Sequence, residues 1–229
     1  MYLGFMDMNA GFLVIIAAMI IGLIARSKVA STYRQFSQVS TGRGLSGAAT
    51  AREILDSYGL ANIGIQEITG NLTDHYDPRS NMLRLSQNVY SGTSIASVGV
   101  AAHEAGHAVQ DAMGYSPFKL RQKLVPVANL GSQMLFPLII GGLFFHITAL
   151  YYLGAALYGA ALLFQLVTLP VEFDASRRAV VYLEKSGSMT APELKGVKKV
   201  LGAASMTYVA AALASLGQMI WLLLAGRRK

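Results

Sequence analysis

The sequence predicts a mainly α-helical, polytopic membrane protein with about four transmembrane helices and a small α+β domain outside the bilayer. Two observations predict this class. The 229 residues carry 31 charged side chains, but three gaps of 18, 48 and 27 residues contain none of them. A hydrocarbon core about 30 Å thick needs roughly 20 apolar residues of helix, so these gaps indicate spanning helices. The other 136 residues have the charge density of an ordinary soluble domain.

The three gaps accommodate four spans. The first runs from about Met8 to Ala25, and the last covers about Ala203 to Ala225. The 48-residue gap is too long for one helix and fits a helical hairpin, with spans from about Leu124 to Phe145 and from about Ile147 to Leu169. Because Asp7 precedes the first span and basic residues follow it, this span is typical of a retained anchor and not of a cleaved signal peptide.

Four spans place both termini on one side of the membrane and two polar segments on the other. These segments contain 16 of the 19 Lys and Arg residues, and the remaining three lie at the C-terminus. Since basic loops tend to remain cytoplasmic, we expect both segments to face the cytoplasm. The expected parts are an N-terminal anchor (1–25), a cytoplasmic part (26–123), a transmembrane hairpin (124–170), a cytoplasmic helix (171–202) and a C-terminal transmembrane helix (203–229).

The longer polar segment contains both helix and strand signals. Ser46 can cap a helix that Gly59 ends, and Ser94 begins a second, buried helix. The sequence Asp77-Pro78-Arg79-Ser80-Asn81 favours a turn between two short strands, which predicts a hairpin. The expected elements are helices over about 46–58 and 94–113 and strands over about 63–69, 72–76 and 82–85.

Composition narrows the chemistry. The chain has no cysteine, which excludes disulfides, thiolate zinc sites, iron–sulfur ligation and cysteine nucleophiles, and leaves His, Asp and Glu as metal ligands. The net charge of +7 could indicate a nucleic-acid partner. In a membrane protein, however, excess Lys and Arg more often mark the loops that stay cytoplasmic, so we do not expect nucleic acid as a partner. Gly42 to Gly47 matches G-x-G-x-x-G, but no strand precedes it, so we expect a flexible linker and not a dinucleotide site.

The buried helix contains His103-Glu104-Ala105-Gly106-His107, which matches H-E-x-x-H. Two histidines four residues apart project from one helical face and can share a metal ion, while Glu104 can accept a proton from the water that the metal activates. The alternative is a pair of core histidines with Glu104 as an ion partner. Burying two imidazoles and a carboxylate costs free energy unless something pairs them, which favours the metal.

A hydrolytic zinc site needs a third protein ligand. His146 lies in the hairpin connection, which the topology places on the opposite face of the membrane, and His75 stays open as a candidate. Glu172 is better placed, just after Pro170 at the end of the third span; its alternative is a surface charge paired with an arginine. If this segment is helical, small residues on the Glu172 face would let it approach the histidines closely: Ala175, Ser176 and Ala179.

Nearby polar residues have open roles. Asp174 would point off the Glu172 face, where it could support a ligand histidine or pair with an arginine. Arg177, Arg178 and Tyr182 could stabilise an oxyanion, although a basic cluster flanking the membrane explains the arginines equally simply.

At these residues the chain resembles the YugP-type family of bacterial membrane zinc metallopeptidases. The resemblance covers nearly the whole chain and is carried by Leu72 to Arg79, Leu83 to Ser86, Val89-Tyr90, Ser94 to Gln110 and Pro170 to Ser176. It implies a gluzincin-like zincin domain with one Zn²⁺ per chain held by His103, His107 and Glu172, and Glu104 as general base. Similar integral membrane peptidases commonly place an aspartate where this chain has Ser176. The resemblance also suggests Met82 to Ser86 as an edge strand that pairs with substrate backbone.

The sequence therefore predicts a zinc-dependent endopeptidase of the bacterial inner membrane, a multi-pass protein with its active site at the cytoplasmic surface. Its partners would be the lipid bilayer and peptide or protein substrates associated with the membrane. Two alternatives remain: an intramembrane zinc protease, and a catalytically silent, zinc-stabilised scaffold or chaperone. Two imidazoles and one carboxylate could also accept manganese or cobalt in vitro.

Overall fold

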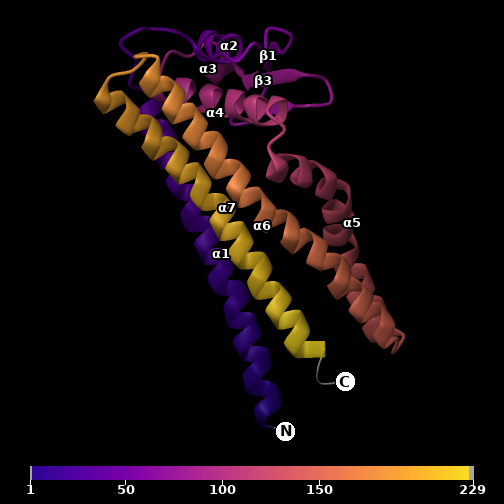
Figure 1. The fold of residues 1–229 in the computed structure, drawn as a ribbon. Helices are drawn as coiled ribbons and strands as arrows, with labels where there is room; N and C mark the ends of the chain where they lie inside the picture. The colour runs from indigo at the N-terminus through magenta and orange to yellow at the C-terminus, as the bar shows by residue number, and fades with distance from the viewer. Residues whose placement is uncertain (1, 227–229) are drawn as a thin grey trace. The chain divides into compact units, whose positions relative to one another are not determined.

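The computed structural model describes residues 2–226 and is mainly helical (Figure 1). Four of its helices are long and apolar enough to cross a membrane, which confirms the predicted class. They belong to α1, α5, α6 and α7, and the remaining elements form a small α+β part. In chain order the elements are α1 (Tyr2–Ser37), α2 (Gly47–Ser57), β1 (Gly64–Ile68), β2 (His75–Asp77), β3 (Met82–Ser86), α3 (Gln87–Tyr90), α4 (Ile95–Ala112), α5 (Ser116–Phe144), α6 (Thr148–Lys185) and α7 (Ala191–Gly226).

The chain divides into two compact units. One comprises Met1–Ala25, Lys119–Leu169 and Thr207–Lys229, and the other comprises Arg26–Phe118 and Pro170–Met206. We call them the apolar unit and the polar unit. The apolar unit holds most of the charge-free stretches, and the polar unit holds all residues of the H-E-x-x-H motif together with Glu172.

The apolar unit contains the expected helical hairpin. Helices α5 and α6 are joined by residues 145–147, where His146 adopts a left-handed conformation (φ 55°) just beyond the end of α5. Gly131 of α5 lies against the backbone of Leu157, where a side chain would not fit, so the two helices approach closely. A small core packs between these helices and the end of α7: Leu135, Tyr151, Tyr158, Ala161 and Leu222.

All four long helices extend past the expected spans, and α6 and α7 do so in the segment expected to be one helix. Helix α6 continues through Pro170 to Lys185 without a break, because the residues after the proline are mostly good helix formers. The expected helix over 171–202 is therefore wrong as a single element: this segment contains the end of α6, a turn at 186–190 and the beginning of α7. Gly187 (φ 63°) terminates α6, and Glu193 accepts hydrogen bonds from the Thr190 backbone and hydroxyl at the start of α7.

The polar unit has a three-stranded sheet in the order β1-β3-β2. The predicted hairpin is present, since β2 pairs antiparallel to β3 across the turn. On its other side β3 pairs in parallel with β1. The expectation that Met82 to Ser86 forms an edge strand is wrong, because both of its edges are already paired. Local turn signals predicted the hairpin, but they carry no information about a parallel partner formed earlier in the chain.

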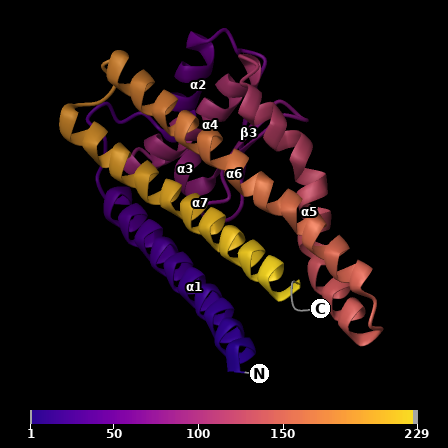
Figure 2. The same cartoon turned by 60° about the horizontal axis from the view of Figure 1, so that its bottom comes forward.

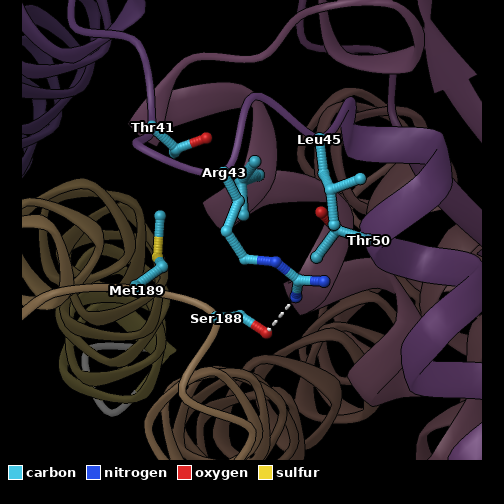
Figure 3. Close-up of a pocket in the computed structure, with 7 residues that line it drawn as sticks. Thr41, Arg43, Leu45, Thr50, Ser188 and Met189 are labelled. Carbon is cyan, nitrogen blue, oxygen red and sulfur yellow. Dashed lines mark hydrogen bonds between the residues drawn. The ribbon is translucent and has the colours of Figure 1, made fainter.

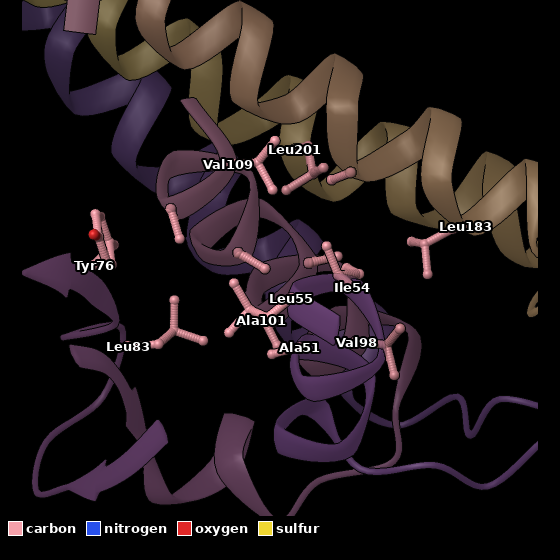
Figure 4. Close-up of a cluster of buried hydrophobic side chains, with 14 of the residues drawn as sticks. Ala51, Ile54, Leu55, Tyr76, Leu83, Val98, Ala101, Val109, Leu183 and Leu201 are labelled. Carbon is pink, nitrogen blue, oxygen red and sulfur yellow. The ribbon is translucent and has the colours of Figure 1, made fainter. Parts of the chain in front are cut away.

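Helix α4 runs through the core of the polar unit (Figure 4). Its N-terminus is capped by the Ser94 hydroxyl, and Ser46 caps α2 in the same way, as predicted. One face of α4 packs against α2 through Ala101 and Leu55, and against the sheet through Leu83. Figure 2 also shows α2 and α4 side by side. The helix that carries the two motif histidines is thus fixed by a closed apolar core.

The segment expected to be a flexible linker is held in place. Thr41 and Gly47 pair through their backbone N–H groups with Thr93 and Gly92. Arg43 forms hydrogen bonds with Glu53 and with the Ser188 hydroxyl, across a small pocket that Thr41, Thr50 and Met189 also line (Figure 3). Gly44 supplies a positive φ of 62°, so the glycines serve a tight turn.

Candidate metal centre

Helix α4 presents His103 and His107 on one face, one turn apart. Their ring centroids are 4.7 Å apart and the rings are nearly perpendicular, at 80°. His107 is buried and also stacks on Phe118, with centroids 6.0 Å apart, whereas His103 is partly exposed. Two neighbouring imidazoles, one buried and one partly exposed, could bind a metal ion together in a site that is accessible from outside.

Glu172 approaches these histidines from α6. Glu172 is 1 % exposed, and its Oε2 atom lies 3.2 Å from Nε2 of His103 and 3.6 Å from Nε2 of His107. One ligand atom from each of the three side chains lies within 4.8 Å of the others. The small residues predicted on both helices explain this proximity, because Gly106 of α4 directly contacts the backbone of Ala175.

The outer nitrogens of both imidazoles have other partners. Nδ1 of His103 lies 3.1 Å from the Ser176 hydroxyl, and Nδ1 of His107 lies 3.0 Å from the side-chain oxygen of Gln110. Both Nε2 atoms consequently face Glu172. Hydrogen bonds at one ring nitrogen orient the other toward a metal, which is the usual arrangement around ligand histidines.

Gln110 is a residue of the site that sequence reasoning missed. It follows His107 by three residues on α4, so helical spacing could have placed it on the same face. Its amide donates to Asp174, which also accepts hydrogen bonds from Arg177 and Arg178. The two roles left open for Asp174 are therefore both present: it supports a histidine through Gln110, and it pairs with arginine.

The electrostatics of the site favour a negative charge on both carboxylates. Burial opposes ionisation of Glu172, but hydrogen bonds and charge from His103 and His107 outweigh it and hold the pKa of Glu172 below its ordinary value. Burial likewise opposes ionisation of Asp174, and hydrogen bonds from Arg178, Arg177 and Gln110 lower the pKa of that carboxyl. Glu172 belongs to the polar part of α6, after the charge-free stretch that ends at Val171.

The donor set fits zinc. Ligand atoms about 2.1 Å from a tetrahedral ion stand roughly 3.4 Å apart, and the two separations between Glu172 and the histidines, 3.2 and 3.6 Å, lie on either side of this value. Imidazole nitrogen and carboxylate oxygen are common zinc ligands, and three protein ligands leave a fourth position open. The buried carboxylate also needs a cation, which a divalent ion supplies.

The other residues that the sequence offered for the site are not part of the cluster of His103, His107 and Glu172 in the described part of the chain. His75 is exposed in β2, with Nδ1 2.8 Å from the Thr73 carbonyl. His146 belongs to the apolar unit. Tyr182 is half-buried against the core of the polar unit. Glu104 follows His103 on α4 and is half-buried.

The membrane helices and the cluster of two histidines and one glutamate are together typical of membrane zinc metallopeptidases. A family model described as "Putative neutral zinc metallopeptidase" matches residues 11–227, and the chain belongs to this family. It is also similar to a curated protein of Bacillus subtilis (strain 168) named "Putative membrane protease YugP". The two are 45% identical over 205 residues, which cover 90% of this chain and 91% of that protein. No solved structure matches the chain.

Proposed function

We propose that the chain is a membrane-embedded zinc-dependent endopeptidase with one Zn²⁺ held by His103, His107 and Glu172. The observation that carries this proposal is the buried Glu172 carboxylate, whose Oε2 atom faces the Nε2 atoms of both motif histidines. Membership of a zinc metallopeptidase family supports the metal and the reaction class.

A bound zinc ion supplies a Lewis acid that polarises a peptide carbonyl and makes a water molecule more acidic. Glu104 is the general base in this proposal. It is the half-buried residue that follows the first ligand histidine, on a helix fixed by the core, and it occupies the general-base position of the H-E-x-x-H pattern. Glu104 accepts the proton of the attacking water and then delivers it to the nitrogen of the leaving amine.

The site acts at the cytoplasmic surface of the bacterial inner membrane in this proposal. Glu172 follows directly on the last residue of the charge-free stretch of α6, which supports a position close to the lipid headgroups. The segments 26–123 and 172–199 hold 16 of the 19 Lys and Arg residues, which supports a cytoplasmic orientation for both segments. Membrane proteins or their cytoplasmic segments are the substrates that could reach such a site.

Strand β2 is the place where extended substrate backbone would pair. Among the described strands it is the edge that packs against α4, and only one of its sides is paired, with β3. Tyr76 secures β2 to α4 by donating a hydrogen bond to Asp111, 3.1 Å away. A strand fixed beside the helix with the motif histidines could align a peptide along the site.

The test compares the zinc-loaded wild type with Glu104→Gln in detergent. Cleavage of an unfolded generic protein and bound zinc are measured in the same samples, with Glu184→Gln, an exposed glutamate of α6, as the matched control. We expect equal zinc in all three, cleavage by the wild type and the control, and a loss of at least about 100-fold in Glu104→Gln. Cleavage by Glu104→Gln at the wild-type rate would contradict the proposed base. Equal zinc without cleavage in any sample would leave two readings, a gated or highly selective peptidase and a zinc-stabilised scaffold, and native membrane substrates would be tested next.

A further inference from the structure

Gln110 makes three hydrogen bonds inside the protein and is fully buried. Its Nε2 donates to the carbonyl of Val171, 2.8 Å away, and to Oδ2 of Asp174, 2.9 Å away. Its Oε1 lies 3.0 Å from Nδ1 of His107. An amide with both N–H groups and its oxygen engaged has no free choice of orientation.

The partners of the Gln110 amide fix which end faces His107. A carbonyl oxygen can only accept hydrogen bonds, so the side of the amide that meets Val171 must be the NH₂ group. Asp174 is an acceptor as well, because Arg177 and Arg178 both donate hydrogen bonds to its carboxylate oxygens. Reversing the amide would place an oxygen against two oxygens. Its Oε1 therefore faces His107, and because this oxygen only accepts, Nδ1 of His107 must carry a proton.

We propose that Gln110 is a positioning residue that selects the tautomer of His107. With the proton held on Nδ1, Nε2 is the nitrogen of His107 that would bind a metal beside Glu172. This inference rests on the proposed zinc site and adds to it the residue that decides how one ligand is presented.

The same contacts position the third ligand. Val171 and Asp174, the two partners of the Gln110 amide, lie on either side of Glu172 in α6. Gln110 therefore ties the turn that carries Glu172 to the histidine that faces it. A change at Gln110 disturbs both the protonation pattern of His107 and the alignment of His107 with Glu172.

The first test measures zinc affinity of the full-length protein in detergent by competition with a chromophoric chelator. Gln110→Met keeps the length of the side chain but removes all three hydrogen bonds. We expect it to bind zinc about 10- to 100-fold more weakly, the usual effect of losing a partner of a ligand histidine. Gln110→Glu keeps an acceptor for Nδ1 but loses the donors to Val171 and Asp174, so we expect a zinc affinity between those of Gln110→Met and the wild type.

The matched control is Ser97→Ala. Ser97 is another buried, hydrogen-bonded side chain of α4, but its partners are Ser94 and Asn88, away from the histidines. We expect this variant to lose stability without losing zinc affinity. Equal zinc affinity in Gln110→Met and the wild type would overturn the proposal. So would an equal loss in Gln110→Met and Gln110→Glu, since restoring the acceptor should restore part of the affinity.

The second test determines the tautomer of His107 without any change at Gln110, so it can be used even if Gln110→Met does not fold. The zinc-loaded chain is labelled with ¹⁵N-histidine in a His75→Asn, His146→Asn background, which leaves the two ligand histidines. The ring signal that changes in Ser176→Ala belongs to His103, and the other belongs to His107. We expect the His107 proton on Nδ1 and the metal on Nε2. A proton on Nε2 would overturn the proposal.

The two tests separate failure of this inference from failure of the proposed function. A wild type that binds no zinc would overturn the metal site and the role of Gln110 together. Tight zinc binding by the wild type with no effect of Gln110→Met would overturn the role of Gln110 alone.

Discussion

Gly106 of α4 lies directly against Ala175 of α6. A Cβ atom on Gly106 would stand 2.8 Å from the carbonyl oxygen of Ala175 and 3.3 Å from its Cα and carbonyl carbon. These are backbone atoms, so they cannot rotate away as the end of a flexible side chain could. The distance between the helix with the two histidines and the helix with Glu172 therefore depends on the missing side chain of Gly106.

Gly106→Ala should destabilise the protein by about 1–3 kcal/mol, as overpacking of a core usually does, and should weaken zinc binding by separating Glu172 from the histidines. Denaturant unfolding and zinc competition would measure both effects. Gly202→Ala is the control, because a Cβ there meets no atom within 4 Å, and its higher helix propensity should leave stability unchanged or slightly increased. Similar behaviour of the two variants would contradict the close contact as the cause.

Ser176 is expected to tune the zinc affinity through His103. Its hydroxyl lies 3.1 Å from Nδ1 of His103. Ser176→Ala should weaken zinc binding by about 10-fold, and Ser176→Asp should match or exceed the wild type, because a carboxylate is the stronger acceptor. Chelator competition would measure both. Weaker binding by Ser176→Asp than by Ser176→Ala would show that the hydroxyl does not orient the ring.

Zinc should stabilise the folded chain, and Glu172 should carry much of that effect. A ligand that binds only the native state at about 100 times its Kd adds roughly 2.7 kcal/mol to stability. We expect the unfolding temperature of the wild type to fall on chelation and to recover when zinc is added. Glu172→Gln removes the anionic ligand and should show a much smaller zinc-dependent shift. A full shift in Glu172→Gln would exclude this carboxylate as a ligand.

The hairpin of β2 and β3 should lose stability in acid through Asp77. Hydrogen bonds from Arg84, 2.6 Å away, and from Ser80 hold the pKa of Asp77 below its ordinary value. A carboxyl with a lowered native pKa stabilises the fold fully above its unfolded pKa of about 3.9, and loses this contribution as the pH falls through the native value.

Asp77→Asn tests this linkage. The stability difference between the wild type and Asp77→Asn should be constant near neutral pH and should shrink below about pH 4. Hydrogen exchange of the strand amides, or urea unfolding at a series of pH values, would follow it. A difference that does not change down to pH 2 would contradict the assignment to this ion pair.

The absence of cysteine allows a direct test of orientation. Gln66→Cys places a thiol at an exposed position of β1, and His146→Cys places one in the exposed turn between α5 and α6. With a maleimide that does not cross membranes, intact bacterial spheroplasts should label only His146→Cys, and permeabilised ones should label both. The opposite pattern would reverse the proposed orientation.

The sequence by itself determined the membrane helices and the pair of motif histidines. Spans follow from local composition, since every peptide group in lipid needs a hydrogen bond within its own helix. The pairing of His103 with His107 follows from helical periodicity, and the caps at Ser46 and Ser94 follow from the local chemistry of helix ends. All of these signals involve residues close together in the chain.

Only the tertiary structure decided which further residues reach the histidines. Glu172 lies 69 residues beyond His103, and it joins the histidines where His75 does not, because Gly106 and Ala175 let two helices touch. Tertiary packing also brings Gln110 into contact with Asp174 and places β3 at the centre of the sheet. Periodicity and capping are properties of a single segment, whereas the packing of two segments depends on shape and polar pairing along their whole interface.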